Sequence, residues 1–166
     1  MNNKLRSTIM WALYAVLFVF VLLIQTVVLG DQRFHGAKLS LLPVAVVCIT
    51  MFTGHEAGGL FGLLAALFWS GTGAEDGSLS IVTFAVCGVA AGYLCDAYFA
   101  RRLIPALGLS LCALAVHQGA SFLLKYYISG MDAALWRWLP VQMGLSLIAC
   151  PVLYPLCRLI RKAGAD

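Results

Sequence analysis

A succession of long apolar runs, almost uninterrupted by charge, constrains this chain more than any other feature. In the clearest of them, residues 10–29, only Gln25 and Thr26 break the apolar character. About 20 apolar residues are enough to cross a hydrocarbon core of ~30 Å as a helix. Of all 166 residues, 62% are hydrophobic and 11% are charged, whereas soluble domains carry about 25% charged residues. Because so few charges cannot cover a surface that faces water, we predict an all-α integral membrane protein.

Six apolar segments are predicted to form about six transmembrane helices in one bundle, a single polytopic domain over residues 1–166. Four segments are of full length, at residues 10–29, 79–99, 104–128 and 139–159. The other two, residues 39–52 with Pro43 and residues 58–69, are short, and segments of that length either span or re-enter the membrane. Because a re-entrant pair returns to its own side, both alternatives leave the two termini on the same side.

The basic residues are divided unevenly between the two sides of this arrangement. Seven fall on the side of the termini: Lys4, Arg6, Arg101, Arg102, Arg158, Arg161 and Lys162. The other side receives Arg33, Lys38 and Arg137, with Lys125 near a helix end. An excess of Lys and Arg marks the cytoplasmic face, so both termini are expected to be cytoplasmic. The net charge of +4 fits contact with anionic membrane lipid, and no basic run interleaved with aromatic residues suggests nucleic acid.

Small residues recur at every fourth position of one apolar segment. The series is Gly54, Gly58, Gly62, Ala66 and Ser70, and a shorter series follows at Gly88 and Gly92. Residues four apart lie on one face of a helix, and small side chains there allow another helix to approach closely within a membrane. The pattern predicts a helix-packing or partner interface, with the neighbouring helix either the chain's own or a partner's.

Polar residues inside the apolar segments are the candidates for function. His117 and Gln118 lie in the middle of residues 104–128. One interpretation is an interhelical hydrogen bond, the usual role of polar residues in membrane bundles; the other is a ligand contact or a proton relay. The absence of an acidic residue near the middle of any segment favours the hydrogen bond. His55 and Glu56 are expected at a helix start, where Glu56 suits the helix dipole.

The sequence lacks the motifs of an independent catalyst. It contains no G-x-S-x-G, no H-E-x-x-H and no phosphate-binding G-x-x-x-x-G-K-[ST]. The six cysteines lie in apolar segments without a C-x-x-C pair, and are expected to pack as small apolar residues. We therefore assign no catalytic, cofactor-binding or metal-binding residue and expect a protein that is not an enzyme.

The order of these features resembles the MreD family of bacterial rod shape-determining membrane proteins, over nearly the whole chain. The similar positions are the basic start, the first apolar run ending in Gln25-Thr26, the Pro43 segment, the stretch from Gly54 to Ala65, the stretch from Gly88 to Tyr93, His117 with Phe122, and Leu153-Tyr154-Pro155-Leu156 before basic residues. One position departs from the family, which often has an acidic residue where this chain has Ser70.

The resemblance implies a non-enzymatic subunit of the bacterial plasma membrane. MreD-like proteins bind the single-pass protein MreC and support RodA and its penicillin-binding transpeptidase in lateral peptidoglycan synthesis, in line with the MreB cytoskeleton. Their fold is similar to that of the substrate-binding subunits of energy-coupling-factor vitamin transporters, which are the alternative function. A third class, an intramembrane enzyme, lacks a paired acid and base.

Overall fold

Helices account for almost all of the computed structural model, as expected where lipid leaves no partner for a backbone group outside regular structure. The structure describes residues 3–28, 33–34, 37–38, 40–71, 77–98, 101–130, 137 and 139–165. The elements follow in chain order: α1 Asn3–Leu23, the π-helical turn η1 Ile24–Val28, β1 Arg33–Phe34, β2 Ala37–Lys38, α2 Leu42–Thr53, α3 His55–Gly71, α4 Gly77–Ala97, α5 Leu103–Ser129, α6 Leu139–Leu147 and α7 Cys150–Ala165.

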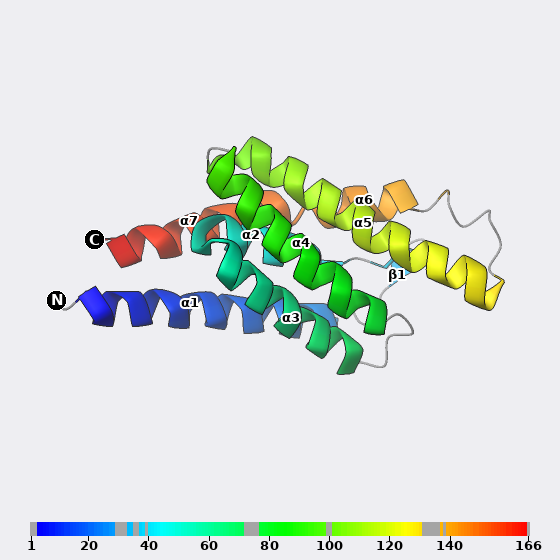
Figure 1. Cartoon of the computed structure of the whole chain (residues 1–166), viewed down its shortest axis with the longest axis horizontal. Helices are drawn as coiled ribbons and strands as arrows, with labels where there is room; N and C mark the ends of the chain where they lie inside the picture. The colour runs from blue at the N-terminus through cyan, green and yellow to red at the C-terminus, as the bar shows by residue number, and fades with distance from the viewer. Residues whose placement is uncertain are drawn as a thin grey trace.

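Four stretches of the described helices are long and apolar enough to cross a membrane. They are Thr8–Val27, Leu79–Ala97, Leu103–Ile128 and Leu139–Ala163. They lie in α1 with η1, in α4, in α5 and in α6 with α7, and they correspond to the four full-length segments predicted from the sequence. This architecture is consistent with a multi-pass membrane protein. The helices run along the long axis of the molecule, with both termini at one end (Figure 1).

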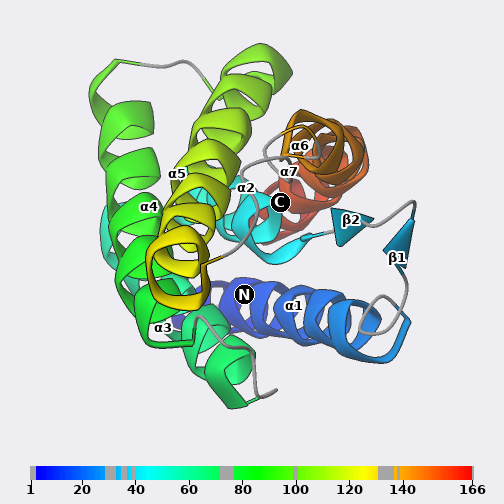
Figure 2. The same cartoon turned by 90° about the vertical axis from the view of Figure 1, so that its right-hand side faces the viewer.

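The short helix α2 occupies the centre of the bundle. Eleven of its 12 residues are buried, all except Thr53, and α2 contacts α1, α3, α4, α5 and α7. The view along the bundle shows α2 surrounded by the longer helices (Figure 2). A helix that is apolar on every side is stable only where protein or lipid surrounds it. At a rise of 1.5 Å per residue, α2 is only about 18 Å long, so it covers about half of the hydrocarbon thickness.

The last apolar segment, predicted as one helix over residues 139–159, is broken in the structure. A turn at Ile148 and Ala149 separates α6 from α7, and the backbone N–H groups of these two residues reach back three positions, to Leu145 and Ser146, at 3.3 Å. Pro151 explains the break, because its ring clashes with the carbonyl four residues earlier and disfavours helical geometry just before it. The two helices nevertheless make up one candidate span.

A two-residue antiparallel pairing lies between α1 and α2. Arg33 pairs with Lys38, and Phe34 pairs with Ala37. The expectation of an all-α chain did not include these strands. The residues before α2 thus turn back on themselves before the chain enters the centre of the bundle.

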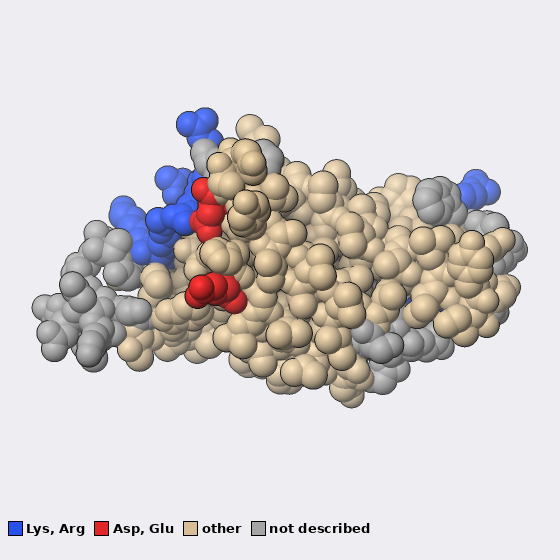
Figure 3. Space-filling view, viewed as in Figure 1, with Lys and Arg blue, Asp and Glu red and all other residues tan. Residues whose placement is uncertain are grey.

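Large apolar side chains are exposed on the outer surface of the helices. The charged side chains lie toward the ends of the face seen in Figure 3, and almost no charge is visible among the described residues between them. Every long helix has such apolar residues on its outward face, among them Val27, Ile104 and Tyr127 at about four-fifths exposed. Inside, Phe61 of α3 packs against Phe18 of α1 with ring centroids 5.3 Å apart. The Tyr14 hydroxyl donates to the carbonyl of Cys157 at 3.1 Å and joins α1 to α7.

Candidate functional site

The small-residue series of α3 packs against α4, a helix of the same chain. A Cβ added at Gly62 would collide with the backbone carbonyl of Phe84, and one added at Gly88 would collide with the carbonyl of Gly58. A Cβ on Gly58 would lie 2.7 Å from the oxygen of Gly88, closer than real side chains allow. The two glycine faces predicted from the sequence therefore meet each other, with backbone against backbone.

A third helix joins the glycine contact. Thr50 of α2 is completely buried, and its methyl group would lie 2.8 Å from a Cβ added at Gly92. The Thr50 hydroxyl donates to the carbonyl of Val46 at 2.6 Å, so it makes its hydrogen bond within α2. Gly92 is also packed against the backbone of His55, at the first turn of α3. The glycines thus let α3 and α4 close over α2.

The ends of the α3 series have other roles. Gly54 lies between α2 and α3 with φ at 93°, a left-handed conformation that glycine adopts without steric cost, and the chain reverses direction there. Ala66 is completely buried, as a helix-packing position should be. Ser70 is exposed near the end of α3, and no described helix packs over it.

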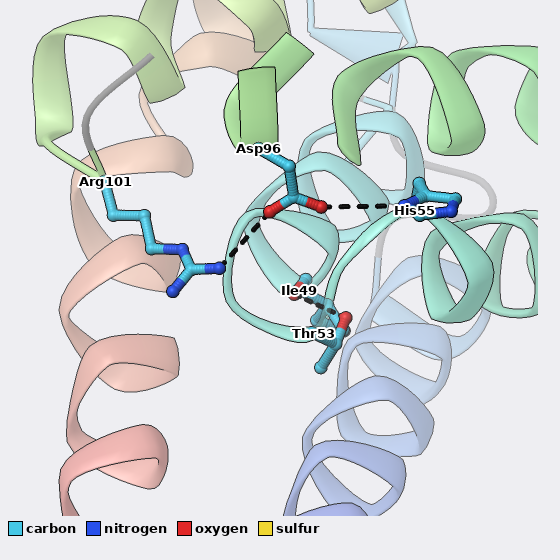
Figure 4. A network of polar contacts seen from close by, with 5 residues as sticks. All are labelled: Ile49, Thr53, His55, Asp96 and Arg101. Atoms are coloured by element: carbon cyan, nitrogen blue, oxygen red, sulfur yellow. Dashed lines mark hydrogen bonds and ion pairs between the residues drawn. The ribbon is translucent and has the colours of Figure 1, made fainter. Parts of the chain in front are cut away.

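Three polar residues meet where α3 begins and α4 ends (Figure 4). The Arg101 guanidinium donates to Oδ1 of Asp96 at 3.3 Å, and Nδ1 of His55 lies 3.6 Å from the other carboxylate oxygen, Oδ2. All three side chains are at least one-third exposed. Thr53 is close by, but its hydroxyl donates to the carbonyl of Ile49 within α2. His55 and Glu56 do begin a helix as predicted, whereas the role of Asp96 was missed.

His117, in the middle of α5, makes a hydrogen bond to α4. Its Nδ1 lies 3.1 Å from the Thr83 hydroxyl, and its ring is 4.4 Å from the ring of Phe84. Trp69 of α3 meets the same imidazole edge to face, with centroids 6.4 Å apart. His117 is 4% exposed. The interhelical hydrogen bond that the sequence favoured for His117 is thus present, and Thr83 is its partner.

Gln118 is buried too, but it lacks such a partner. Neither its amide oxygen nor its amide nitrogen has a hydrogen-bond partner within the described part of the chain, and the same is true of the Ser121 hydroxyl one turn further along α5. These side chains are 6% and 9% exposed. A buried polar group without a partner costs about 1–3 kcal/mol, so this pair is the least satisfied part of the described interior.

The start of α2 brings further polar groups to the centre of the bundle. The backbone N–H of Leu41 donates to Oε1 of Gln25 at 2.7 Å, and the N–H of Ser40 donates to the Ser146 hydroxyl at 3.0 Å. These bonds from η1 and α6 satisfy donors that a helix start leaves open. The Ser40 hydroxyl is buried without a partner among the described residues.

Gln118 and the start of α2 lie on the same side of the contacts that Cys150 makes with α2 and α5. Cys150 defines a common level for the two helices, because its sulfur contacts Cys48 of α2 at 3.9 Å and Ser110 of α5 at 3.8 Å. Ser40 precedes Cys48 by eight positions and Gln118 follows Ser110 by eight positions. Since α2 and α5 run in opposite directions, both residues lie beyond that level, toward the end remote from the termini (Figure 1).

The cysteines fit the packing role predicted for them in four cases. Cys48, Cys95, Cys150 and Cys157 are buried, Cys87 is half-buried and Cys112 is exposed, and all six are free thiols. No group of three or more potential metal ligands occurs among the residues that the structure describes. The polar clusters among the described residues are the Asp96 network at the end with the termini, the buried polar residues of α5, and the polar groups at the start of α2.

Comparisons of the chain with protein families, with curated proteins and with solved structures find no match.

Proposed function

We propose that this chain is a non-catalytic membrane subunit of the MreD type, which binds an MreC-like single-pass partner and supports lateral peptidoglycan synthesis in a rod-shaped bacterium. RodA, its penicillin-binding transpeptidase and MreB would be further members of the same assembly. The proposal includes about six transmembrane segments in one bundle, of which the second and third, α2 and α3, either span the membrane or form a re-entrant pair, in a fold similar to that of energy-coupling-factor substrate-binding subunits. Both termini would be cytoplasmic.

One observation carries this proposal: the positions on which the family resemblance rests are packing positions. Gly58, Gly62, Gly88 and Gly92 bring α3 and α4 into backbone contact. Tyr154 joins α7 to the turn before α5, because its hydroxyl donates to the carbonyl of Arg101 at 2.7 Å. A pattern of residues that maintains a shape is what a scaffold requires, since its task is to present a defined helix surface to a partner.

A test combines depletion of the protein with capture of its partners. In a rod-shaped host, depletion should make the cells wide or round, and the tagged protein should co-purify with a single-pass, coiled-coil periplasmic protein. Gly62→Leu should fail to restore the rod shape, because it places a large side chain in the α3–α4 contact. Gly108→Leu, at a position where no atom lies within 4 Å of an added Cβ, is the matched control and should restore it.

A second candidate is the substrate-binding subunit of an energy-coupling-factor vitamin transporter. The observation that favours it is the set of buried, unpaired groups on Gln118, Ser121 and Ser40, since small-molecule sites use a few convergent polar groups in an apolar surround. It predicts a normal cell shape after depletion, a vitamin retained on purification, and loss of vitamin uptake in His117→Ala or Gln118→Leu. Those results would contradict the scaffold.

A further inference from the structure

Five basic residues gather at the end of the molecule where both termini lie. Arg101 and Arg102 precede α5, and Arg158, Arg161 and Lys162 lie in the last turns of α7. We call this set the basic end. Arg161 is half-buried and the other four are exposed. Lys and Arg side chains are visible together at this end of the surface (Figure 3).

Two contacts hold the two parts of the basic end in place. The hydrogen bond from the Tyr154 hydroxyl to the Arg101 carbonyl, at 2.7 Å, fixes the start of α5 against α7. On α7, the guanidinium of Arg161 lies 5.9 Å from the ring centroid of Phe52 at the end of α2, within the range of a cation–π interaction. The basic end is thus a defined surface formed by two segments that are more than 55 residues apart in the chain.

Little of its charge is neutralised by the residues that the structure describes. Asp96 pairs with Arg101 at 3.3 Å. The other four basic residues make no ion pair with any residue that the structure describes. Like charges held together repel one another, and an anion from outside the chain would relieve that repulsion.

We propose that the basic end binds the phosphate group of an anionic phospholipid in the adjacent leaflet. Arginine matches phosphate geometry with two parallel hydrogen bonds. The neighbouring outward side chains are apolar: Ile104 is 80% exposed and Leu159 is 68% exposed. Basic groups beside apolar groups at helix ends match a lipid, whose headgroup and acyl chain meet at that boundary, better than they match an acidic protein in water.

Native mass spectrometry of the purified protein tests this proposal. We expect phosphatidylglycerol to bind more tightly than phosphatidylcholine in detergent titrations. The double variant Arg102→Gln/Arg158→Gln should weaken binding of phosphatidylglycerol by about 25-fold, at about 5-fold for each charge removed. Binding of phosphatidylcholine should not change. The double variant Arg102→Lys/Arg158→Lys keeps both charges, so its loss of phosphatidylglycerol binding should be much smaller than that of the glutamine double variant. Arg137→Gln, an exposed arginine between α5 and α6, is the matched control and should bind like the unmodified chain.

The proposal is wrong if the double variant keeps its preference for phosphatidylglycerol while its thermal unfolding midpoint is unchanged. It is also wrong if Arg137→Gln loses as much binding, since net charge alone would then account for the effect. The proposal would also be overturned if the basic end bound neither lipid but was required for binding of an acidic partner peptide. The surface would then be a site of contact with a protein. The measurement uses the purified chain alone and requires only that the chain is a membrane protein. Failure of the lipid proposal can therefore be distinguished from failure of the proposed role in cell shape.

Discussion

Adjacent residues of α5 show how one helix position decides whether a buried polar group is satisfied. His117 reaches Thr83 of α4 at 3.1 Å, whereas Gln118 has no partner among the described residues. Successive residues on a helix point about 100° apart, so the two side chains face different neighbours. Both are buried, and burial alone therefore says nothing about which of them is paired.

Thr83→Val should destabilise the protein by about 0.6 kcal/mol, because it removes the hydroxyl that joins α4 to α5 and keeps the side-chain volume. The free energy of unfolding in mixed detergent would measure the change. Thr53→Val is the matched control, since the Thr53 hydroxyl bonds to Ile49 within its own helix, and its effect should be smaller. Equal losses for the two variants would mean that the His117 contact contributes nothing between the helices.

Among the elements, the pair α3–α4 depends most directly on residue size. The two helices meet through the backbone at Gly58, Gly62 and Gly88, and hydrophobic burial cannot drive such a contact within lipid. Its stability comes from close van der Waals packing, which one methyl group is enough to prevent. The opposite holds for the middle of α5, where Gly108 and Gly119 have open space around them.

Gly62→Ala should lower the stability of the protein by about 1–3 kcal/mol, the usual cost of forcing an extra methyl group into a packed contact. A lower thermal midpoint in detergent and a lower yield would report it. Gly108→Ala adds the same methyl group to a helix where nothing lies within 4 Å, and should be neutral or slightly stabilising because alanine favours helix. If both variants behave alike, α3 and α4 do not pack as described.

At the scale of the whole molecule, charge and length specify the proposed topology. The basic end carries five basic residues beside the termini, and the part of the chain at the opposite end includes Arg137. The six predicted passes leave both termini on one side. The excess of Lys and Arg predicts that this side faces the cytoplasm.

Reporter fusions check this topology. A reporter placed after Lys162, or within residues 100–103, should be active in the cytoplasm, and one placed within residues 73–78 should be active outside. The physical reason is that basic residues flanking short loops resist translocation. An external reporter at the C-terminus would rule out an even number of crossings.

The apolar runs alone predicted the four helical stretches that are long and apolar enough to cross a membrane, because the length of a spanning helix follows from bilayer thickness. The spacing of Gly58, Gly62, Gly88 and Gly92 also predicted close helix contacts, since a helix places every fourth residue on one face. The length of an apolar run and the spacing of glycines are local properties of the chain. They can be identified without knowing which helix packs against which.

The contacts between residues of different helices could not be predicted from the sequence. The sequence left open whether α3 packs against its own chain, and it did not indicate that Asp96 would lie between His55 and Arg101 or that Gln25 would bond to the start of α2. The contacts of Asp96 with His55 and of Gln25 with Leu41 join residues that are far apart in sequence, and no local pattern encodes their distance. The central place of α2 follows from the same cause, because a short apolar helix is equally suited to lipid and to a protein interior until its neighbours enclose it.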